Sequence, residues 1–210
     1  MLVKQTNKFS VMLVDMINFV CVPVRLLIPQ PIISKIPILR TNEEERALRI
    51  LAEYRGVALD IGCGSNRIIK SYRQSGKDGT GIDVYNWDGP DLIVEDTSDL
   101  PFAPKTFDTI SFVACLNHIP NRLDVLREAS RILKPTGKVL ITNLTPVVSQ
   151  IWHRIAFWDA DQRERGMKEG EVWGFRDSEL REMLAGVGFR FVKKVGFMWG
   201  LNHLYVFEPK

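Results

Sequence analysis

Cysteine is scarce in this chain of 210 residues, and the three cysteines that it has form no pattern. Cys21, Cys63 and Cys115 include no C-x-x-C pair and leave one thiol over, which argues against a disulfide framework and against a cysteine-based zinc site. We therefore expect the protein to occupy a reducing compartment.

The chain also lacks a strong bias in composition. Its 15 glycines and 11 prolines are near average usage, which excludes collagen-like and low-complexity classes. With 45% apolar and 25% charged residues, it has the length and composition for one main globular domain with a sizeable core. A net charge of +3 is too small to indicate a nucleic-acid-binding face, and no internal repeat is present.

No apolar run reaches the length of a transmembrane helix, although residues 1–42 are strongly apolar. Asp15, Asn18, Pro23 and Arg25 interrupt the run before the roughly 18 consecutive apolar residues that a span requires. Asp15 would also split the apolar region of a secretory signal, and no small-x-small cleavage site follows it. We therefore expect a cytoplasmic protein in which residues 1–42 form an N-terminal leader.

The basic excess of the chain lies in this leader, which has 5 basic residues against 1 acid, whereas the remainder has 23 against 24. On a helical projection, the polar side chains of the leader form one stripe opposite a wide apolar face. The stripe consists of Lys4, Lys8, Asp15, Asn18 and Arg25. Three roles remain open for such a helix: a lid over the protein's own pocket, the seam of a homodimer, and contact of residues 1–40 with the inner face of the cell membrane.

Residues 43–210 alternate short apolar strands with amphipathic helices, which predicts an α/β domain with a parallel sheet and helices on both faces. We expect strands over residues 57–61, 80–84, 91–95, 107–114 and 138–142, and helices over residues 43–54, 67–73, 121–133 and 177–185. Two closely spaced strands, residues 189–195 and 201–207, would then pair as a C-terminal antiparallel hairpin.

In a parallel sheet, ligands bind beyond the carboxyl ends of the strands. The first strand ends in Asp60 and continues into Gly62-Cys63-Gly64, where the missing β-carbons let a ligand approach the backbone. The second strand ends in Asp83, 21 residues after Gly62, where it can accept hydrogen bonds from two ribose hydroxyls. The combination predicts a nucleoside-binding site. Arg67 stands where a dinucleotide fingerprint requires a third glycine, which disfavours nicotinamide and flavin cofactors.

Five ordered motifs in the chain resemble those of the class I S-adenosylmethionine-dependent methyltransferases, most closely the type 11 methyltransferase domain of small-molecule enzymes, which includes quinone-biosynthesis methyltransferases. The motifs are residues 57–64 with Asp83, residues 95–102, Phe107-Asp108, residues 117–120 and residues 133–137. The resemblance covers residues 43–208. It implies a Rossmann-like, seven-stranded sheet, S-adenosylmethionine as cofactor and S-adenosylhomocysteine as product.

The resemblance also implies roles for individual residues. Gly62 and Gly64 would approach the amino acid part of the cofactor, and Asp60 would orient either the loop or the cofactor's ammonium group. Asp83 would hold the ribose hydroxyls, and Asp96 would accept a hydrogen bond from the adenine amino group. The complete expected cofactor set is Asp60, Gly62, Cys63, Gly64, Asp83, Val84, Asp96, Thr97 and Ala114.

Two features depart from the family pattern. Asn66 replaces the usual glycine after the G-x-G pair, and because asparagine tolerates left-handed backbone, we expect cofactor binding to be retained. The connection between the second and third strands is too short for a helix. Tyr85 or Trp87 in this connection would either stack on adenine or belong to a plain surface turn.

Methyl transfer by in-line displacement mainly requires that the acceptor be held about 3 to 3.5 Å from the methyl carbon, so a general base is optional. If the acceptor must lose a proton, His118 and His153 are the candidate bases, although a structural role for His118 remains open. His203 is expected to be structural. Aromatic and charged side chains within residues 144–175 predict an acceptor pocket, an amphipathic helix pair packed on the sheet, or both, since the two are compatible. The expected pocket residues are Trp152, Phe157, Trp158 and Trp173.

We therefore expect methyl transfer to a small, lipophilic or amphiphilic acceptor. The stretch Ala114-Cys115-Leu116-Asn117-His118 has neither the Asn-Pro-Pro-aromatic element of amino-methylating nucleic-acid enzymes nor the acids of catechol-type metal-dependent ones, so we expect no nucleic acid and no metal. Two alternatives remain open. One is methylation of a sugar or a cell-surface polymer precursor, and the other is a non-catalytic, cofactor-binding module that serves a partner enzyme.

Overall fold

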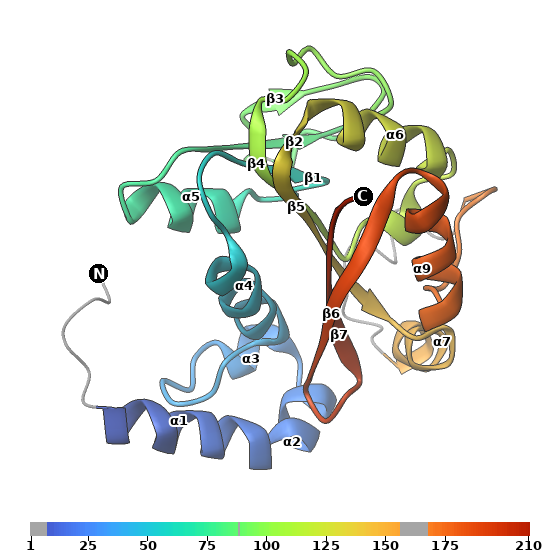
Figure 1. Cartoon of the computed structure of the whole chain (residues 1–210). Coiled ribbons are helices and arrows are strands. Elements are labelled where there is room, and N and C mark those ends of the chain that lie inside the picture. The colour runs from blue at the N-terminus through green and yellow to red at the C-terminus, as the bar shows by residue number, and fades with distance from the viewer. Residues whose placement is uncertain (1–7, 88, 156–167) are drawn as a thin grey trace. The chain divides into compact units, whose positions relative to one another are not determined.

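The computed structural model describes residues 8–87, 89–155 and 168–210, without the side chains of residues 152–155 (Figure 1). It divides into two compact units, Met1–Leu48 and Arg49–Lys210. The expected leader therefore belongs to the first unit, and the strand-rich part of the chain belongs to the second.

The second unit is built on a seven-stranded sheet with the order β3-β2-β1-β4-β5-β7-β6. The strands are β1 (Ala58–Ile61), β2 (Gly79–Asp83), β3 (Leu92–Ile93), β4 (Phe107–Val113), β5 (Leu133–Leu144), β6 (Phe189–Phe197) and β7 (Asn202–Pro209). Strands β1 to β5 pair in parallel, whereas β7 is antiparallel to both of its neighbours, β5 and β6. The predicted Rossmann-like sheet and its C-terminal hairpin are thus confirmed.

The crossover helices place secondary structure on both faces of this sheet. The helices are α5 (Arg67–Gln74), α6 (Arg122–Ile132), α7 (Pro146–Ile155) and α9 (Asp177–Gly186), and a short 3-10 turn, η1 (Leu116–His118), follows β4. Helix α5 joins β1 to β2, and α6 joins β4 to β5, so the two crossovers proceed in opposite directions along the sheet (Figure 1). Because parallel crossovers are right-handed, opposite directions place these two helices on opposite faces.

The core of the second unit explains its strand pattern. All four residues of β1 are buried, as expected of a central parallel strand that is covered on both faces. On α6, Leu126, Ala129 and Ile132 repeat at helical spacing and are fully buried in the same apolar cluster. Strand β5 begins at Leu133, earlier than the expected residue 138, because this residue pairs with β4 ahead of a register shift.

The described part of the leader, from residue 8 on, forms the helices α1 (Lys8–Val20), α2 (Val22–Leu27) and α3 (Gln30–Ile33), and the first unit also contains the start of α4 (Asn42–Glu53). The expected single helix through residue 25 is therefore wrong. It is interrupted at Cys21, and α2 starts with Pro23 in its first turn, where a residue without an N–H group is tolerated. None of the described helices is both long and apolar enough to cross a bilayer.

Candidate functional site

The glycine turn after β1 lies against the carboxyl end of β2. The N–H groups of Gly62 and Cys63 both donate to the carbonyl oxygen of Ile82, at 2.9 and 3.0 Å. The N–H group of Gly64 donates to Oδ2 of Asp83 at 2.9 Å. These bonds bring the residues predicted from two separate strands together at one edge of the sheet.

The two glycines of this turn serve different purposes. Both have left-handed backbone, with φ of +73° at Gly62 and +52° at Gly64, a conformation that side chains disfavour. A β-carbon at Gly62 would lie only 2.7 Å from Cβ of Cys115, so this glycine is also required for packing. A β-carbon at Gly64 would meet no heavy atom within 4 Å. The backbone of Gly64 is therefore open to the approach of a ligand.

Asn66 has the left-handed backbone that its residue type predicted, with φ of +58°. Its buried side chain donates from Nδ2 to the carbonyl oxygen of Gly89 and to Oδ2 of Asp91, both at 3.0 Å. The same carboxylate accepts from the N–H group of Gly81 and from the guanidinium of Arg73. Asn66 thus ties the glycine turn to the β2–β3 connection, which a glycine could not do.

Asp83 is a buried carboxylate at the end of β2, only 6% exposed. Besides the bond from Gly64, its Oδ1 accepts from the N–H group of Tyr85 at 3.0 Å. A carboxylate has about four lone-pair sites, so two accepted bonds leave capacity for the hydroxyls of a ribose. The next residue, Val84, is 44% exposed.

Asp60 is buried at the end of a chain of hydroxyl groups. Ser111 Oγ donates to Oδ1 of Asp60 at 2.6 Å, and Tyr54 Oη lies 2.5 Å from the same Oγ. The pKa of Asp60 is raised to about 7, mainly by burial and in part by the nearby carboxylate of Asp83, while the bond from Ser111 opposes the rise. A cation placed beside Asp60 would favour its charged form, so this position suits an ammonium group.

The residues after β4 pack against β1 and β5. Ala114 is left-handed, with φ of +55°, and its N–H group donates to Thr142 Oγ1 at 2.9 Å. Cys115 Sγ donates to the carbonyl oxygen of Ile61 at 2.9 Å. Burial raises the pKa values of both Cys63 and Cys115 well above the usual thiol value, so both side chains act as packing groups rather than as thiolates.

Asp96 lies in the loop after β3, and its carboxylate accepts hydrogen bonds from residues of this loop and from Asn121. Oδ1 accepts from the Ser98 N–H group at 2.8 Å and from Asn121 Nδ2 at 3.3 Å, and Oδ2 accepts from Ser98 Oγ at 2.8 Å. The two bonds from Ser98 lower the pKa of Asp96. Thr97 is buried beside it. The adenine contact that the resemblance implies for these residues stays a prediction.

His118 lies in η1 and pairs with Glu171, an acid that the sequence analysis did not single out. His118 Nδ1 is 3.0 Å from Glu171 Oε2, and the glutamate side chain is only 1% exposed. The adjacent residues also pair, because the Val172 N–H group donates to the Asn117 carbonyl oxygen at 2.9 Å and Asn117 Nδ2 donates back at 3.3 Å. The segment of residues 168–176 is thereby held against the end of β4. In the sequence, nothing distinguishes Glu171 from the other acids near it.

A second contact joins this segment to the β2–β3 connection. Lys168 Nζ donates to Tyr85 Oη and lies 5.1 Å from the centroid of the Tyr85 ring. The rings of Tyr85 and Trp87 are 5.8 Å apart, and both side chains are 40% exposed. Stacking of either ring on adenine stays a prediction.

The expected acceptor pocket lies mostly outside the described part of the chain. Trp173 is half-buried in the segment that carries Glu171. Trp152 and His153 belong to α7, but their side chains are outside the described residues, and so are Phe157 and Trp158 entirely. Among the residues that the structure describes, no group of three or more histidine, cysteine, aspartate or glutamate side chains could hold a metal ion.

Comparison with known proteins identifies the family. Residues 40–194 match a family model described as a methyltransferase domain, which is well over half of the chain. The chain belongs to the S-adenosylmethionine-dependent methyltransferase family. The cofactor of this family fits the edge of the sheet, where Gly64 offers open backbone, Asp83 offers acceptors for a ribose and Asp60 offers a partner for an ammonium group.

Relatives and solved structures agree with this assignment. A ubiquinone/menaquinone biosynthesis C-methyltransferase from Desulfotalea psychrophila is 29% identical in an alignment of 126 positions that covers 53% of this chain and 51% of the relative. A ubiquinone biosynthesis O-methyltransferase from Xanthomonas euvesicatoria is 28% identical over 41% of this chain and 42% of the relative. The methyltransferase thus spans about half the length of these relatives or less. The PH0226 protein of Pyrococcus horikoshii is 25% identical, with a TM-score of 0.61 over 79% of this chain and 89% of that chain.

Proposed function

We propose that this methyltransferase transfers a methyl group from S-adenosylmethionine to a small, lipophilic or amphiphilic acceptor. The observation that carries the proposal is the glycine turn hydrogen-bonded to Asp83 at the ends of β1 and β2, in a chain of this family. When bound, the cofactor supplies a methyl group activated by a positively charged sulfur. The task left to the protein is to bind both reactants, align them and exclude water.

In this proposal, different residues at the sheet edge bind different parts of the cofactor. Asp83 accepts hydrogen bonds from the ribose, and the open backbone of Gly64 borders the amino acid part of the cofactor. Asp60 stabilises an ammonium group through its carboxylate. Ala114, whose backbone is fixed by Thr142, borders the methionyl part from the neighbouring strand.

The lipophilic character of the acceptor has two supports. The names of several relatives state that they act in ubiquinone or menaquinone biosynthesis. The part of this chain assigned to acceptor binding is rich in large aromatic residues, namely Trp152, Phe157, Trp158 and Trp173. We also propose that residues 1–40 bring the protein to a membrane surface, as a peripheral protein on the cytoplasmic face.

For an acceptor that must lose a proton, we propose His118 as the general base and Glu171 as the residue that orients it. A buried carboxylate at Nδ1 fixes the orientation of the ring, which is the arrangement that general-base histidines use. His153 on α7 is the second candidate for this role.

The assignment is tested with methyl-labelled S-adenosylmethionine, the purified full-length protein and a cell extract, followed by separation of the label into organic-soluble, small aqueous and macromolecular fractions. We expect label in the organic phase, and none with Asp83→Ala, whose lost affinity for S-adenosylhomocysteine is checked by calorimetry. Label in the aqueous or polymer fraction would contradict the lipophilic acceptor. Cofactor binding without any transfer would favour the non-catalytic module.

The same assay tests the proposed base. Glu171→Gln keeps the size of the side chain but removes its charge, and we expect the maximal rate to fall about tenfold with little change in cofactor affinity. Glu169→Gln makes the same chemical change at an exposed position two residues away and should leave the rate unchanged. Equal rates for the two variants would contradict the role of Glu171.

A further inference from the structure

Helix α1 carries large apolar side chains on one exposed face. Seven large apolar side chains of α1 are exposed by 40 to 64%. Val11 lies on the other side of the helix, and the remaining six are Phe9, Met12, Leu13, Met16, Phe19 and Val20. At 3.6 residues per turn, these positions fall within an arc of about 120° around the helix axis. We call this surface the α1 arc. Exposed apolar side chains that gather on one face indicate a surface that meets another apolar phase.

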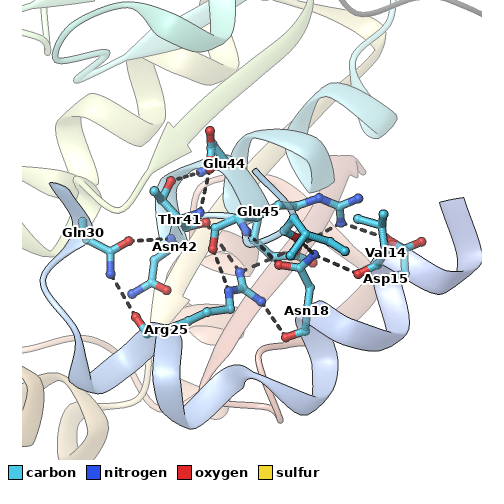
Figure 2. Close-up of polar contacts among 11 residues, drawn as sticks. Val14, Asp15, Asn18, Arg25, Gln30, Thr41, Asn42, Glu44 and Glu45 are labelled. Atoms are coloured by element: carbon cyan, nitrogen blue, oxygen red, sulfur yellow. Dashed lines mark hydrogen bonds and ion pairs between the residues drawn. The ribbon is translucent and has the colours of Figure 1, made fainter. Parts of the chain in front are cut away.

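The opposite face of α1 carries Val11, Val14 and Asn18, and the asparagine binds within the leader's own unit. Asn18 is 2% exposed, its Nδ2 donates to the carbonyl oxygen of Ile38 at 3.0 Å, and its Oδ1 accepts from the N–H group of Arg40 at 2.8 Å. Figure 2 shows the Asn18 and Arg25 side chains directed toward the chain around Thr41 and Glu45. These bonds fix the rotation of α1 about its axis, so the α1 arc faces away from the segment that leads into α4.

The guanidinium of Arg25 completes this anchorage. It is 1% exposed, and its Nε donates to the carbonyl oxygen of Arg40 at 2.7 Å, while its Nη1 donates to that of Asn18 at 3.0 Å. Its Nη2 lies 3.8 Å from Oε2 of Glu45. Arg40 in turn pairs with Asp15 at 2.7 Å. The two arginines therefore act within the unit, and both have acidic partners.

Two further basic residues in the described part of the leader lie at its surface. Lys8, at the start of α1, and Lys35, after α3, are both exposed. Because the internal arginines are neutralised by acids, these lysines give the exposed side of the leader a positive charge. Phenylalanine and leucine on one face of a helix, with lysine beside them, are typical of helices that lie in the interface of an anionic membrane.

The dimensions of the α1 arc favour a bilayer over a second copy of the chain. The seam of a coiled-coil dimer is a narrow stripe that repeats over three or more heptads. Helix α1 has 13 residues, less than two heptads, and its apolar arc is about 120° wide. A wide, short apolar surface matches a helix that is buried lengthwise among headgroups.

We propose that the α1 arc is the surface through which this methyltransferase binds an anionic membrane, with α1 lying parallel to the bilayer. The inference rests on the membrane contact included in the proposed function, and it names the side chains that make it. Phe9, Met12, Met16 and Phe19 enter the acyl boundary, while Lys8 stays among the headgroups. The anchorage through Asn18 and Arg25 keeps this face outward before a membrane is met.

The test uses the full-length protein and sedimentation with vesicles of phosphatidylcholine alone or with 30% phosphatidylglycerol, without cofactor or acceptor. We expect binding to the anionic vesicles, weaker binding to the neutral ones, and a loss of about tenfold or more with Met12→Gln plus Met16→Gln. Met12→Glu plus Met16→Glu should weaken binding further. Both substitutions replace exposed side chains, and folding is checked by the affinity for S-adenosylhomocysteine.

The matched control is Ser10→Glu plus Ser34→Glu, which adds the same two charges to exposed leader positions outside the α1 arc. Strong residual binding of this control, together with weak binding of Met12→Glu plus Met16→Glu, supports the proposal. An equal loss of binding in both glutamate variants would show that only net charge matters and would overturn the proposal. A wild-type protein that does not bind the vesicles would also overturn it. If the protein instead forms concentration-dependent dimers and the methionine substitutions abolish them, the α1 arc binds a second copy of the chain. Methyl transfer is measured separately, so its failure would leave a positive vesicle result intact.

Discussion

At the scale of the residue, Gly64 and Gly76 offer a matched pair. Both have left-handed backbone, with φ of +52° and +78°, and at both positions a β-carbon would meet nothing within 4 Å. An alanine should therefore cost similar stability at each, about 1 kcal/mol. The two positions differ in their location: Gly64 follows β1 at the proposed cofactor site, whereas Gly76 follows α5.

We expect Gly64→Ala to weaken S-adenosylhomocysteine binding about tenfold or more, because its methyl group would occupy the open space beside the backbone. Gly76→Ala should bind the ligand as the wild type does. Thermal unfolding checks that the two variants lose similar stability, and calorimetry measures the affinity. Unchanged affinity in Gly64→Ala would remove this residue from the cofactor site.

Asp60 predicts how stability depends on pH. Its pKa is about 7 in the folded protein against an ordinary 3.8, so between these values the folded state holds a proton that the unfolded state has lost. The stability that this group contributes is complete at low pH and is lost as the pH rises from about 4 through 7. The full shift corresponds to about 4 kcal/mol.

We therefore expect the wild type to lose stability relative to Asp60→Asn as the pH rises from 5 to 8, in denaturant titrations without cofactor. Asparagine cannot ionise but still accepts the bond from Ser111. Parallel pH profiles of the two proteins would show that Asp60 does not change its charge in this range.

At the scale of the element, the anchorage of α1 and α2 depends on one buried arginine. Burial is the main cause that lowers the pKa of Arg25, and the nearby charge of Arg40 adds to it, whereas Glu45 opposes the shift. The backbone carbonyls of Asn18 and Arg40 depend on Arg25 for their hydrogen bonds. Its removal leaves buried acceptors unsatisfied, which is among the more costly changes in a folded protein.

We expect Arg25→Met to destabilise the leader by about 2 to 4 kcal/mol. Amide exchange of residues 8–45 should accelerate, while exchange in Arg49–Lys210 should stay near the wild-type rate because the two units are compact by themselves. Arg127→Met, at a side chain that is 62% exposed, is the control and should change neither region. Identical exchange of α1 and α2 in the two variants would contradict the role given to Arg25.

A second feature at this scale is the segment that carries Glu171. It contacts two loops that follow different strands, through His118 after β4 and Tyr85 after β2. Both loops lie at the carboxyl edge of the sheet, where the strand ends supply the proposed cofactor residues. One short segment therefore connects the proposed base with the loop beside Asp83, the residue proposed to bind the ribose.

At the scale of the whole molecule, the site follows from the order of the strands. The chain moves from β1 outward to β2 and β3, and then returns to place β4 on the other side of β1. The two crossovers diverge at this point, so the loops that follow β1 and β4 leave toward opposite faces and make room for a ligand. Gly62 and Ala114 stand in these two loops.

Much of the fold and of the candidate site can be predicted from local patterns in the sequence. The seven strands, the glycine turn, the acid at the end of β2 and the C-terminal hairpin were predicted, although not every strand boundary, because each depends on residues that are near one another in sequence. Asn66 belongs to the same class, since its left-handed backbone follows from its own side chain. The family motifs also combine such local signals in a fixed order.

Other features depend on residues that are far apart in the sequence and that meet only in the folded protein. The pairing of His118 with Glu171 joins residues 53 positions apart, and the charge of Asp60 depends on its burial and on the distant residues Ser111 and Asp83. The polar stripe of the leader was visible in the sequence, but only folding decided that Arg25 is buried and that α1 ends before it. Burial and long-range pairing change the energy of a group through its surroundings, and local sequence patterns do not contain those surroundings.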